Sequence, residues 1–258
     1  MKQEQNFKTV AVFIDADNVP AKKIDFIISE LANYGAVMVR KIYGNWKSER
    51  LKGWEEVLLD YALAPVQQFD YAKGKNATDM ALTIDVMDML YSGKIDVFCI
   101  VSSDSDFTPL AMRVKTEGKQ VIGFGRHSTS KALVAACNKF LFLDDEQQTT
   151  SGQDANTSPN RRTGSQLKMD TALMNLLRNA VADCCDENGW ASLNRVGQVV
   201  NNQSSFDSKN YGYAKLGDLI RAIDIFETQL AENRSQLLVR NKRQNQPAHQ
   251  ANPLKTTP

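Results

Sequence analysis

Cysteine is scarce in this chain of 258 residues, and long apolar runs are missing. The four cysteines (Cys99, Cys137, Cys184 and Cys185) lack the spacing of a metal site, which favours a reduced, intracellular protein. No apolar stretch approaches the roughly 20 residues that span a membrane. The opening MKQEQNFKTV lacks the apolar segment of a signal peptide. The sequence therefore predicts a cytoplasmic protein without a membrane span.

An excess of charge of one sign is also absent. The 31 lysines and arginines nearly balance 30 aspartates and glutamates, so the net charge of +1 predicts no partner by itself. Hydrophobic residues make up 42% and charged residues 24%, as is typical of globular proteins. The length suits one large domain or two smaller ones. Local clusters of charge must therefore carry any functional signal.

The most informative stretch is VAVFIDADNV at residues 10–19. A continuous apolar run of this kind is typical of a buried central strand in a parallel sheet. The run ends in Asp15, followed by Asp17 and Asn18. Ligand sites of open α/β sheets lie at the carboxyl ends of the strands. Asp15 is therefore a candidate site residue, whereas Asp17 and Asn18 also fit a simple role as helix caps.

Strand and helix patterns alternate through the first half of the chain. The helix expected over Ala77–Tyr91 carries Met80, Ile84, Met87 and Leu90 on one side. Alternation of strands and helices indicates βαβ units, and therefore an α/β fold with a mainly parallel sheet. Strands are expected near residues 10–14, 36–43, 65–69, 95–101, 120–124 and 139–143.

The composition changes after residue 145. Residues 146–168 are rich in Gln, Thr, Ser, Asn and Gly and are expected to form a flexible linker between domains. Residues 169–240 show three helical patterns and two short strand patterns, the order of a winged helix-turn-helix. The proline-containing tail at 241–258 is expected to be disordered. We therefore expect two domains, at 1–145 and 169–240.

Carboxylates occur at three places where the apolar pattern does not require them. Asp15 follows the first strand, Asp79 begins a helix, and Asp104 with Asp106 follows the fourth strand. If the first and fourth strands are neighbours, Asp15 and Asp104 meet at one edge, where like charges repel. A divalent cation would remove that repulsion, and Mg²⁺ or Mn²⁺ prefers oxygen ligands. Asp79 also fits a first-turn acid that complements the helix dipole.

Basic residues surround these acids in the sequence. Lys73 and Lys75 precede Asp79 in a KGKN loop, and Arg126 follows the fifth strand. A basic loop beside a metal site suits a polyanionic substrate, although a solvated turn explains it equally well. His127 is interpreted as a surface residue rather than a general base.

Three segments in the right order resemble the NYN domain of the PIN-like ribonuclease superfamily. They read FIDADN, KGKNATDMALTIDVMDML and VFCIVSSDSDFTPLAMRVKTEGKQVIGFG, and the resemblance runs from about residue 9 to residue 144. It implies metal-dependent cleavage of RNA on a PIN-like α/β/α sandwich. It also implies that Asp15, Asp79 and Asp104 bind metal, with Asp106 as a fourth catalytic candidate. Asn18 matches a family position that orients substrate or a ligand.

The second half contains WASLNRVGQVVNNQSSFDSKNYGYAKLGDLIRAIDIFE, which resembles a LOTUS (OST-HTH) domain. LOTUS domains resemble winged helices and are associated with RNA binding or with protein docking, and the sequence leaves both roles open. The tyrosines Tyr211 and Tyr213, which carry part of the resemblance, also fit ordinary core packing.

The sequence thus predicts an RNA-cleaving, Mg²⁺- or Mn²⁺-dependent hydrolase with catalytic Asp15, Asp79, Asp104 and Asp106. Asn18, Lys73, Lys75 and Arg126 are the candidate substrate-binding residues. One alternative is a non-catalytic RNA-binding or scaffolding protein with the same fold, but a negative cleft disfavours simple binding of a polyanion. The other alternative is a phosphatase or nucleotide hydrolase, which is disfavoured because the sequence lacks a Walker-type phosphate loop. The oligomeric state is not predicted.

Overall fold

A computed structural model describes residues 7–69, 77–144, 161–203, 205–231 and 236–242. The chain divides into two compact units. One contains residues 1–162 with 198–216, and the other contains 163–197 with 217–258. The sequence assigns 198–216 to the second domain, so this division differs from the expected one. Most of the expected linker lies outside the described residues, and Gly164–Met169 at its end forms helix α6.

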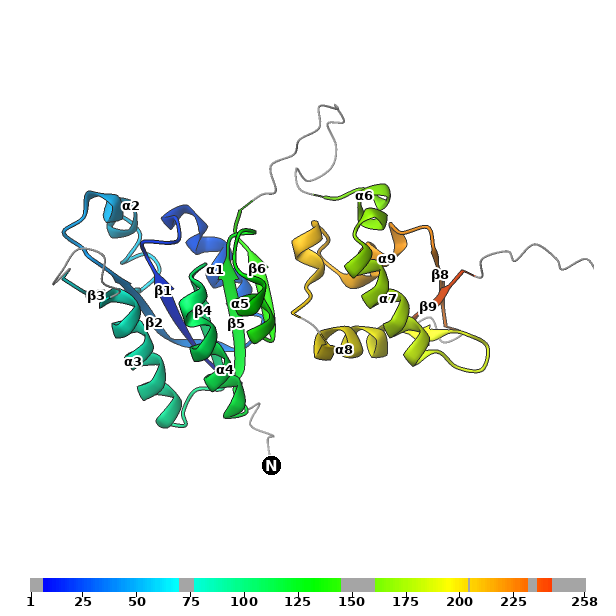
Figure 1. Ribbon diagram of the computed structural model, residues 1–258, viewed down its shortest axis with the longest axis horizontal. Helices are drawn as coiled ribbons and strands as arrows, with labels where there is room; N and C mark the ends of the chain where they lie inside the picture. The colour runs from blue at the N-terminus through cyan, green and yellow to red at the C-terminus, as the bar shows by residue number, and fades with distance from the viewer. Residues whose placement is uncertain (1–6, 70–76, 145–160, 204, 232–235, 243–258) are drawn as a thin grey trace, which may run out of the picture. The chain divides into compact units, whose positions relative to one another are not determined.

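The first unit is built on a six-stranded sheet in which every pairing is parallel. The strand order is β3-β2-β1-β4-β5-β6, and Figure 1 shows β1 and β4 in the middle. The expected α/β class with a mainly parallel sheet is confirmed. The strands are β1 (Thr9–Asp15), β2 (Ala36–Gly44), β3 (Ala64–Gln67), β4 (Val97–Val101), β5 (Gln120–Gly125) and β6 (Lys139–Phe142).

Helices cover both faces of this sheet and make a three-layer α/β/α sandwich (Figure 1). Alternate residues of β1 divide between the two cores, with Val12 on one face and Phe13 on the other. The first face packs against α1 (Ile24–Leu31) and α2 (Lys52–Glu55). The second face packs against α3 (Ala77–Tyr91), α4 (Thr108–Thr116) and α5 (Lys131–Ala136). Burial on both faces explains why β1 and β4 read as continuous apolar runs.

The face of helix α3 that packs against the sheet differs from the apolar face that the sequence predicted. Leu82, Val86 and Leu90 are buried in the core, whereas Met80 is 62% exposed and Ile84 54% exposed. The grouping of Met80 and Ile84 with Leu90 was therefore wrong. At about 100° per residue both sets form an apolar stripe, so periodicity alone does not select the inward one.

The second unit contains the small antiparallel sheet β7-β9-β8 and most of the expected winged helix. Both predicted hairpin strands are present, and β7 adds a third strand that the sequence did not indicate. The elements of this half of the chain are α6, α7 (Thr171–Cys184), β7 (Ala191–Ser192), α8 (Leu193–Gln203), α9 (Leu216–Arg221), β8 (Phe226–Leu230) and β9 (Leu237–Asn241). Among the described residues no helix is both long and apolar enough to span a membrane.

Gly123 in β5 tests the packing between the sheet and its second helical face. A Cβ at this position would lie 2.9 Å from Sγ of Cys137 and closer still to the ring of Phe140, which is 1% exposed. We expect Gly123→Ala to reduce the free energy of unfolding by about 1–3 kcal/mol, because overpacked cores must shift. Gly53→Ala in α2 is the matched control, because its nearest neighbour is Cβ of Ala21 at 3.8 Å. Urea denaturation followed by tryptophan fluorescence checks this, and equal loss in both variants would contradict it.

Candidate active site

Strands β1 and β4 end at the same edge of the sheet. They are parallel neighbours, and Ile14 lies opposite Val101 in the register. Asp15 is therefore the last residue of β1, at the edge where Ser102 and Asp104 follow β4. The strand order also reverses between β1 and β4, and such switch points are where open α/β sheets bind ligands. The expectation that these two strands are neighbours is confirmed.

Asp15 is a buried carboxylate, only 1% exposed, held by three hydrogen bonds. Its Oδ2 accepts from Nδ2 of Asn18 at 2.6 Å and from Oγ of Ser102 at 2.8 Å, while Oδ1 accepts from the Asp17 amide at 3.2 Å. Burial raises the pKa of Asp15, and the hydrogen bonds from Asn18 and Ser102 oppose that rise. The structure thus places Asn18 in contact with Asp15, and its role in orienting substrate or a ligand stays a prediction.

Ser102 connects the two acidic strand ends. Its side chain is fully buried, and its Oγ donates to Asp15 and accepts from the Asp104 amide at 3.1 Å. One hydroxyl thus fixes the carboxylate of β1 against the turn after β4. From the sequence, Ser102 fits either a residue that orients the acidic side chains or a cap of the next helix. Its hydrogen bond to Asp15 corresponds to the first of these two interpretations.

Asp104 and Asp106 lie in the turn that leads from β4 into α4. Oδ1 of Asp104 accepts from the Asp106 amide at 2.9 Å and caps the short 3₁₀ helix Ser105–Phe107. Pro109 in the first turn of α4 then suits the start of that helix. The cap explains why the backbone turns here, and it holds the carboxylate of Asp104 near the sheet edge.

Asp79 brings a third segment to these acids. It lies in the first turn of α3, and its pKa is raised to about 6. Burial is the largest cause, followed by the negative charges of Asp15, Asp104, Asp106 and Asp17. Carboxylates from β1, α3 and the turn after β4 therefore repel one another in one region. Asp17, which the sequence left as a possible helix cap, contributes to this negative field.

The basic candidates divide into described and undescribed residues. Nη2 of Arg126 donates to the Asn18 carbonyl at 3.4 Å, and its amide donates to Oγ of Ser103 at 2.9 Å. This places the guanidinium beside the loop that follows β1. Lys73 and Lys75 lie outside the described residues. His127 stacks on Phe142 and contacts Asp144 through Nδ1 at 3.0 Å, as suits a structural residue.

The donor chemistry of the acid cluster fits a hard divalent cation. All of its members are carboxylates, and their mutual repulsion would be relieved by positive charge. In the described part of the chain, however, no three His, Cys, Asp or Glu side chains are arranged so that they could hold a metal ion by themselves. Mg²⁺ commonly uses one or two carboxylates together with waters and substrate phosphates, so an incomplete protein cage is compatible with it.

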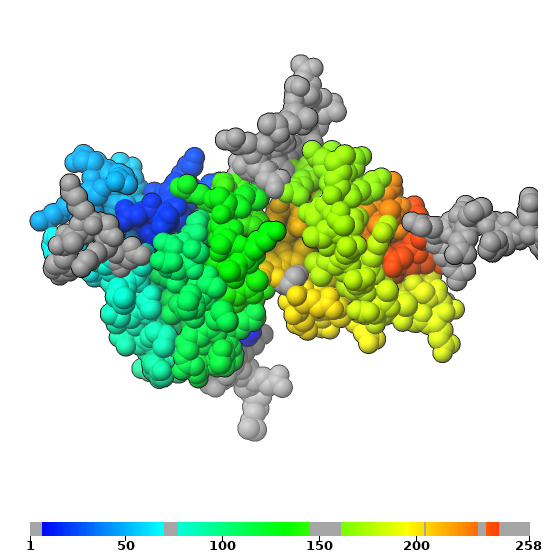
Figure 2. Space-filling model, in the orientation of Figure 1, coloured from blue at the N-terminus to red at the C-terminus, as the bar shows by residue number. Residues whose placement is uncertain are grey.

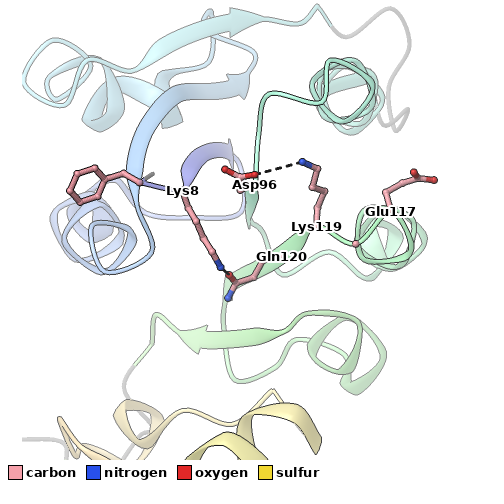
Figure 3. Close-up of a pocket in the computed structure, with 7 residues that line it drawn as sticks. Lys8, Asp96, Glu117, Lys119 and Gln120 are labelled. Atoms are coloured by element: carbon pink, nitrogen blue, oxygen red, sulfur yellow. Dashed lines mark hydrogen bonds and ion pairs between the residues drawn. The ribbon is translucent and has the colours of Figure 1, made fainter. Parts of the chain in front are cut away.

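A separate cavity of about 500 Å³ lies at the opposite end of the strands. Figure 3 shows Lys119 approaching Asp96 and Lys8 approaching Gln120 across it. Asp96 precedes β4 and also accepts from the Thr9 amide, so this carboxylate joins two strand beginnings. The cavity is lined by residues of both charges and by none of the candidate site residues.

Comparison with known proteins agrees with this architecture. The NYN domain model matches residues 9–144, and the OST-HTH/LOTUS domain model matches residues 166–237. The chain belongs to the NYN domain family and carries a LOTUS domain after the NYN domain. Both resemblances inferred from the sequence are confirmed, in the expected order.

Individual relatives add little about activity. An uncharacterised protein of Methanocaldococcus jannaschii is 26% identical over 121 residues, which cover 45% of this chain and 47% of that protein. The chain thus spans about half the length of this curated relative. The solved structure of a Vibrio parahaemolyticus protein of unknown function is 19% identical, with a TM-score of 0.47. The match covers 55% of this chain and 97% of the Vibrio chain. An uncharacterised Nitrosomonas europaea protein is 29% identical, with a TM-score of 0.30, over 40% of this chain and 98% of its own.

Burial of Asp79 and repulsion among the acids predict a pH dependence of stability without metal. The folded-state pKa of Asp79 lies above its ordinary value of 3.8, at about 6. Its contribution is therefore fully favourable below pH 4 and is lost as the pH rises through about 6. Discounted for solvent screening, we expect about 1 kcal/mol, or roughly 2–4 °C in Tm.

Melting curves in EDTA at pH 4.5 and pH 7 check this expectation. Asp79→Asn removes the titrating carboxyl group. The Tm of this variant minus the Tm of the wild type should therefore increase as the pH rises. Asp88→Asn is the control, because Asp88 is an exposed acid on the same helix. A Tm difference between Asp79→Asn and the wild type that does not change with pH would show that the pKa of Asp79 is not raised in the folded protein.

Proposed function

We propose that this chain is a divalent-metal-dependent endoribonuclease whose LOTUS domain captures RNA. The observation that carries the proposal is the gathering of carboxylates from β1, α3 and the turn after β4 at one sheet edge. Burial and the charges of these neighbours together raise the pKa of Asp79. Membership of the NYN family, within the PIN-like nuclease superfamily, supports the same reaction class.

Each site residue has a distinct role in this proposal. Asp15, Asp79 and Asp104 would bind the metal together with waters and substrate phosphate, because these carboxylates do not form a complete cage by themselves, and Asp106 is a fourth acid. A bound Mg²⁺ or Mn²⁺ ion would supply a water activated for attack on phosphorus and would neutralise charge on the phosphate. Asn18 and Ser102 keep Asp15 in position through its Oδ2. Preorganisation of this kind avoids rearrangement of the ligands during the reaction.

Arg126 supplies the positive charge that a polyanionic substrate requires. Its contact with the Asn18 carbonyl places a guanidinium at the loop after β1. Arginine binds phosphate oxygens through two parallel hydrogen bonds, so Arg126 suits a phosphate next to the cleaved bond. In the sequence-based interpretation, Lys73 and Lys75 extend this positive surface.

A non-catalytic RNA-binding protein is the second candidate. The acid cluster speaks against it, because negative charge without a cation lowers affinity for RNA. Fold membership alone does not decide between the two, since one fold supports many functions. A direct assay of cleavage is therefore the decisive experiment.

Asp104→Asn tests the catalytic assignment. An amide keeps the shape of the side chain and its cap to Asp106, but removes the charge that binds metal. We expect single-turnover cleavage of RNA in Mn²⁺ to fall at least about 100-fold, while the Tm in EDTA is unchanged or higher.

Asp88→Asn, purified in parallel, controls for contaminating nuclease and should cleave at the wild-type rate. EDTA should abolish cleavage by the wild type. Wild-type cleavage by Asp104→Asn, or no cleavage by the wild type in either ion, would overturn the enzymatic assignment.

The proposed role of the LOTUS domain predicts a separation of binding from chemistry. Lys215 and Lys242 are exposed lysines in this half of the chain. We expect Lys215→Glu with Lys242→Glu to weaken RNA affinity about 3- to 10-fold at 50 mM salt and less at 200 mM, because phosphate contacts are salt-dependent. Single-turnover cleavage at saturating RNA should be unchanged.

Lys94→Glu makes the same change of charge at an exposed position beside the beginning of β4, away from the acids. Fluorescence anisotropy at both salt concentrations should show little effect of this control. Unchanged affinity in the double variant would indicate that the LOTUS domain docks a protein instead.

A further inference from the structure

Helix α3 has an apolar stripe that the first unit does not cover. Its inward residues Leu82, Val86 and Leu90 fill the core, yet Met80, Ile84 and Tyr91 remain 62%, 54% and 71% exposed. Figure 2 shows the surface of α3 at the front of the molecule, beside that of α4. Contiguous apolar patches exposed on a protein surface mark interaction sites.

The exposed stripe has the spacing of a coiled-coil seam. Ala77, Met80, Ile84, Met87 and Tyr91 follow one another at intervals of three, four, three and four residues. Met80, Ile84 and Tyr91 are exposed, whereas Ala77 and Met87 are half-buried and Met87 also packs against the core. This 3-4 alternation keeps one face of a helix against a partner helix. The stripe runs the full 15 residues of α3, or about 22 Å.

Helix α4 packs beside α3 and carries one exposed apolar residue of its own. Met112 is 57% exposed, and the neighbouring Arg113 reaches the hydroxyl of Tyr91 at 3.4 Å. Arg113 also pairs with Glu117, so its charge is already balanced within α4. The surface is therefore an apolar seam with one apolar neighbour, and not a basic groove suited to RNA.

We propose that a second copy of this chain occupies the seam, through antiparallel pairing of α3 with α3. A two-fold axis midway between Ile84 and Met87 would bring Ile84 of one copy against Met87 of the other. It would also bring Met80 against Tyr91, a pairing of sulfur with an aromatic ring that is favourable. The stripe is thus complementary to itself, as a two-fold interface requires.

Charge selects the antiparallel direction over the parallel one. Asp79 lies at the beginning of α3, and parallel pairing would bring two acid clusters side by side. Antiparallel pairing separates the two Asp79 residues by about 20 Å along the helices and opposes the helix dipoles. Asp88, the acid that flanks the seam, then lies opposite Thr83 instead of another carboxylate. Both proposed active sites remain at the outer ends of the helix pair.

The size of the seam predicts a weak dimer. A single pair of 15-residue helices with Met112 at its side should bury less than about 1,200 Å² in total, the lower end of specific interfaces. We therefore expect a dissociation constant on the order of 10 µM. Dimer formation is independent of cleavage, so it is tested without any activity measurement.

Sedimentation velocity of the full chain from 1 to 200 µM tests the proposal. The wild type should pass from monomer to dimer, and Ile84→Lys should raise the dissociation constant at least 10-fold with an unchanged Tm, because Ile84 is exposed. Leu59→Lys is the matched control, since Leu59 is 91% exposed and lies outside the seam. A wild type that stays monomeric, or a dimer that Ile84→Lys leaves intact, overturns the proposal. A monomer in which Ile84→Lys lowers the Tm would mean that another segment of the same chain covers the stripe, and overturns it too.

Disulfide formation determines the direction of pairing. In a Cys185→Ser background, Met80→Cys protein mixed with Tyr91→Cys protein should form a cross-linked dimer under mild oxidation. Tyr91→Cys protein alone should cross-link poorly. Efficient cross-linking of Tyr91→Cys protein with itself, without a cross-link between the two variants in the mixture, would indicate parallel pairing and overturn the antiparallel arrangement.

Discussion

The parallel pairing of β1 with β4 places two fully buried strands side by side and makes them end at one edge. Because both faces of the sheet are covered, the chain becomes polar only where these strands end. Asp15 follows immediately and is itself buried, so its charge must be compensated within the protein. The hydroxyl of Ser102 and the amide of Asn18 provide that compensation. The positions of Asp104 and of the loop that contains Asn18 depend on these contacts.

Electrostatics links this edge to the proposed reaction. Asp79 approaches from α3 and increases the negative charge around Asp15, so the fold concentrates charges of one sign at a cost in stability. A cation would offset that cost, and the same cation would be the natural partner of a phosphodiester. The features that destabilise the acid cluster without metal are therefore the ones that would suit it to the proposed cleavage of RNA.

Helix α3 contributes to two different surfaces. Its first turn carries Asp79, its inward face completes the core beneath β1 and β2, and its outward face carries the seam proposed for dimerisation. Asp85 fixes the helix against β2 by accepting hydrogen bonds from Lys41 and Tyr43, both at 2.7 Å. A rigid helix of this kind holds Asp79 at the site while its far side remains available to a partner.

The order of strands and helices, the two families and the acids after β1 and β4 could all be read from the sequence, because apolar runs and their polar ends are local patterns. Other features depended on which segments meet in space. The stripes of α3 are both apolar, so only packing against the sheet decided that Leu82 lies inward and Ile84 outward. The tertiary structure likewise decided the role of Ser102, because a serine after a strand can donate a hydrogen bond to Asp15 only when the neighbouring strand ends in that residue. Asp17 joined the negative field for the same reason, since electrostatic repulsion depends on distance in space and not on separation along the chain.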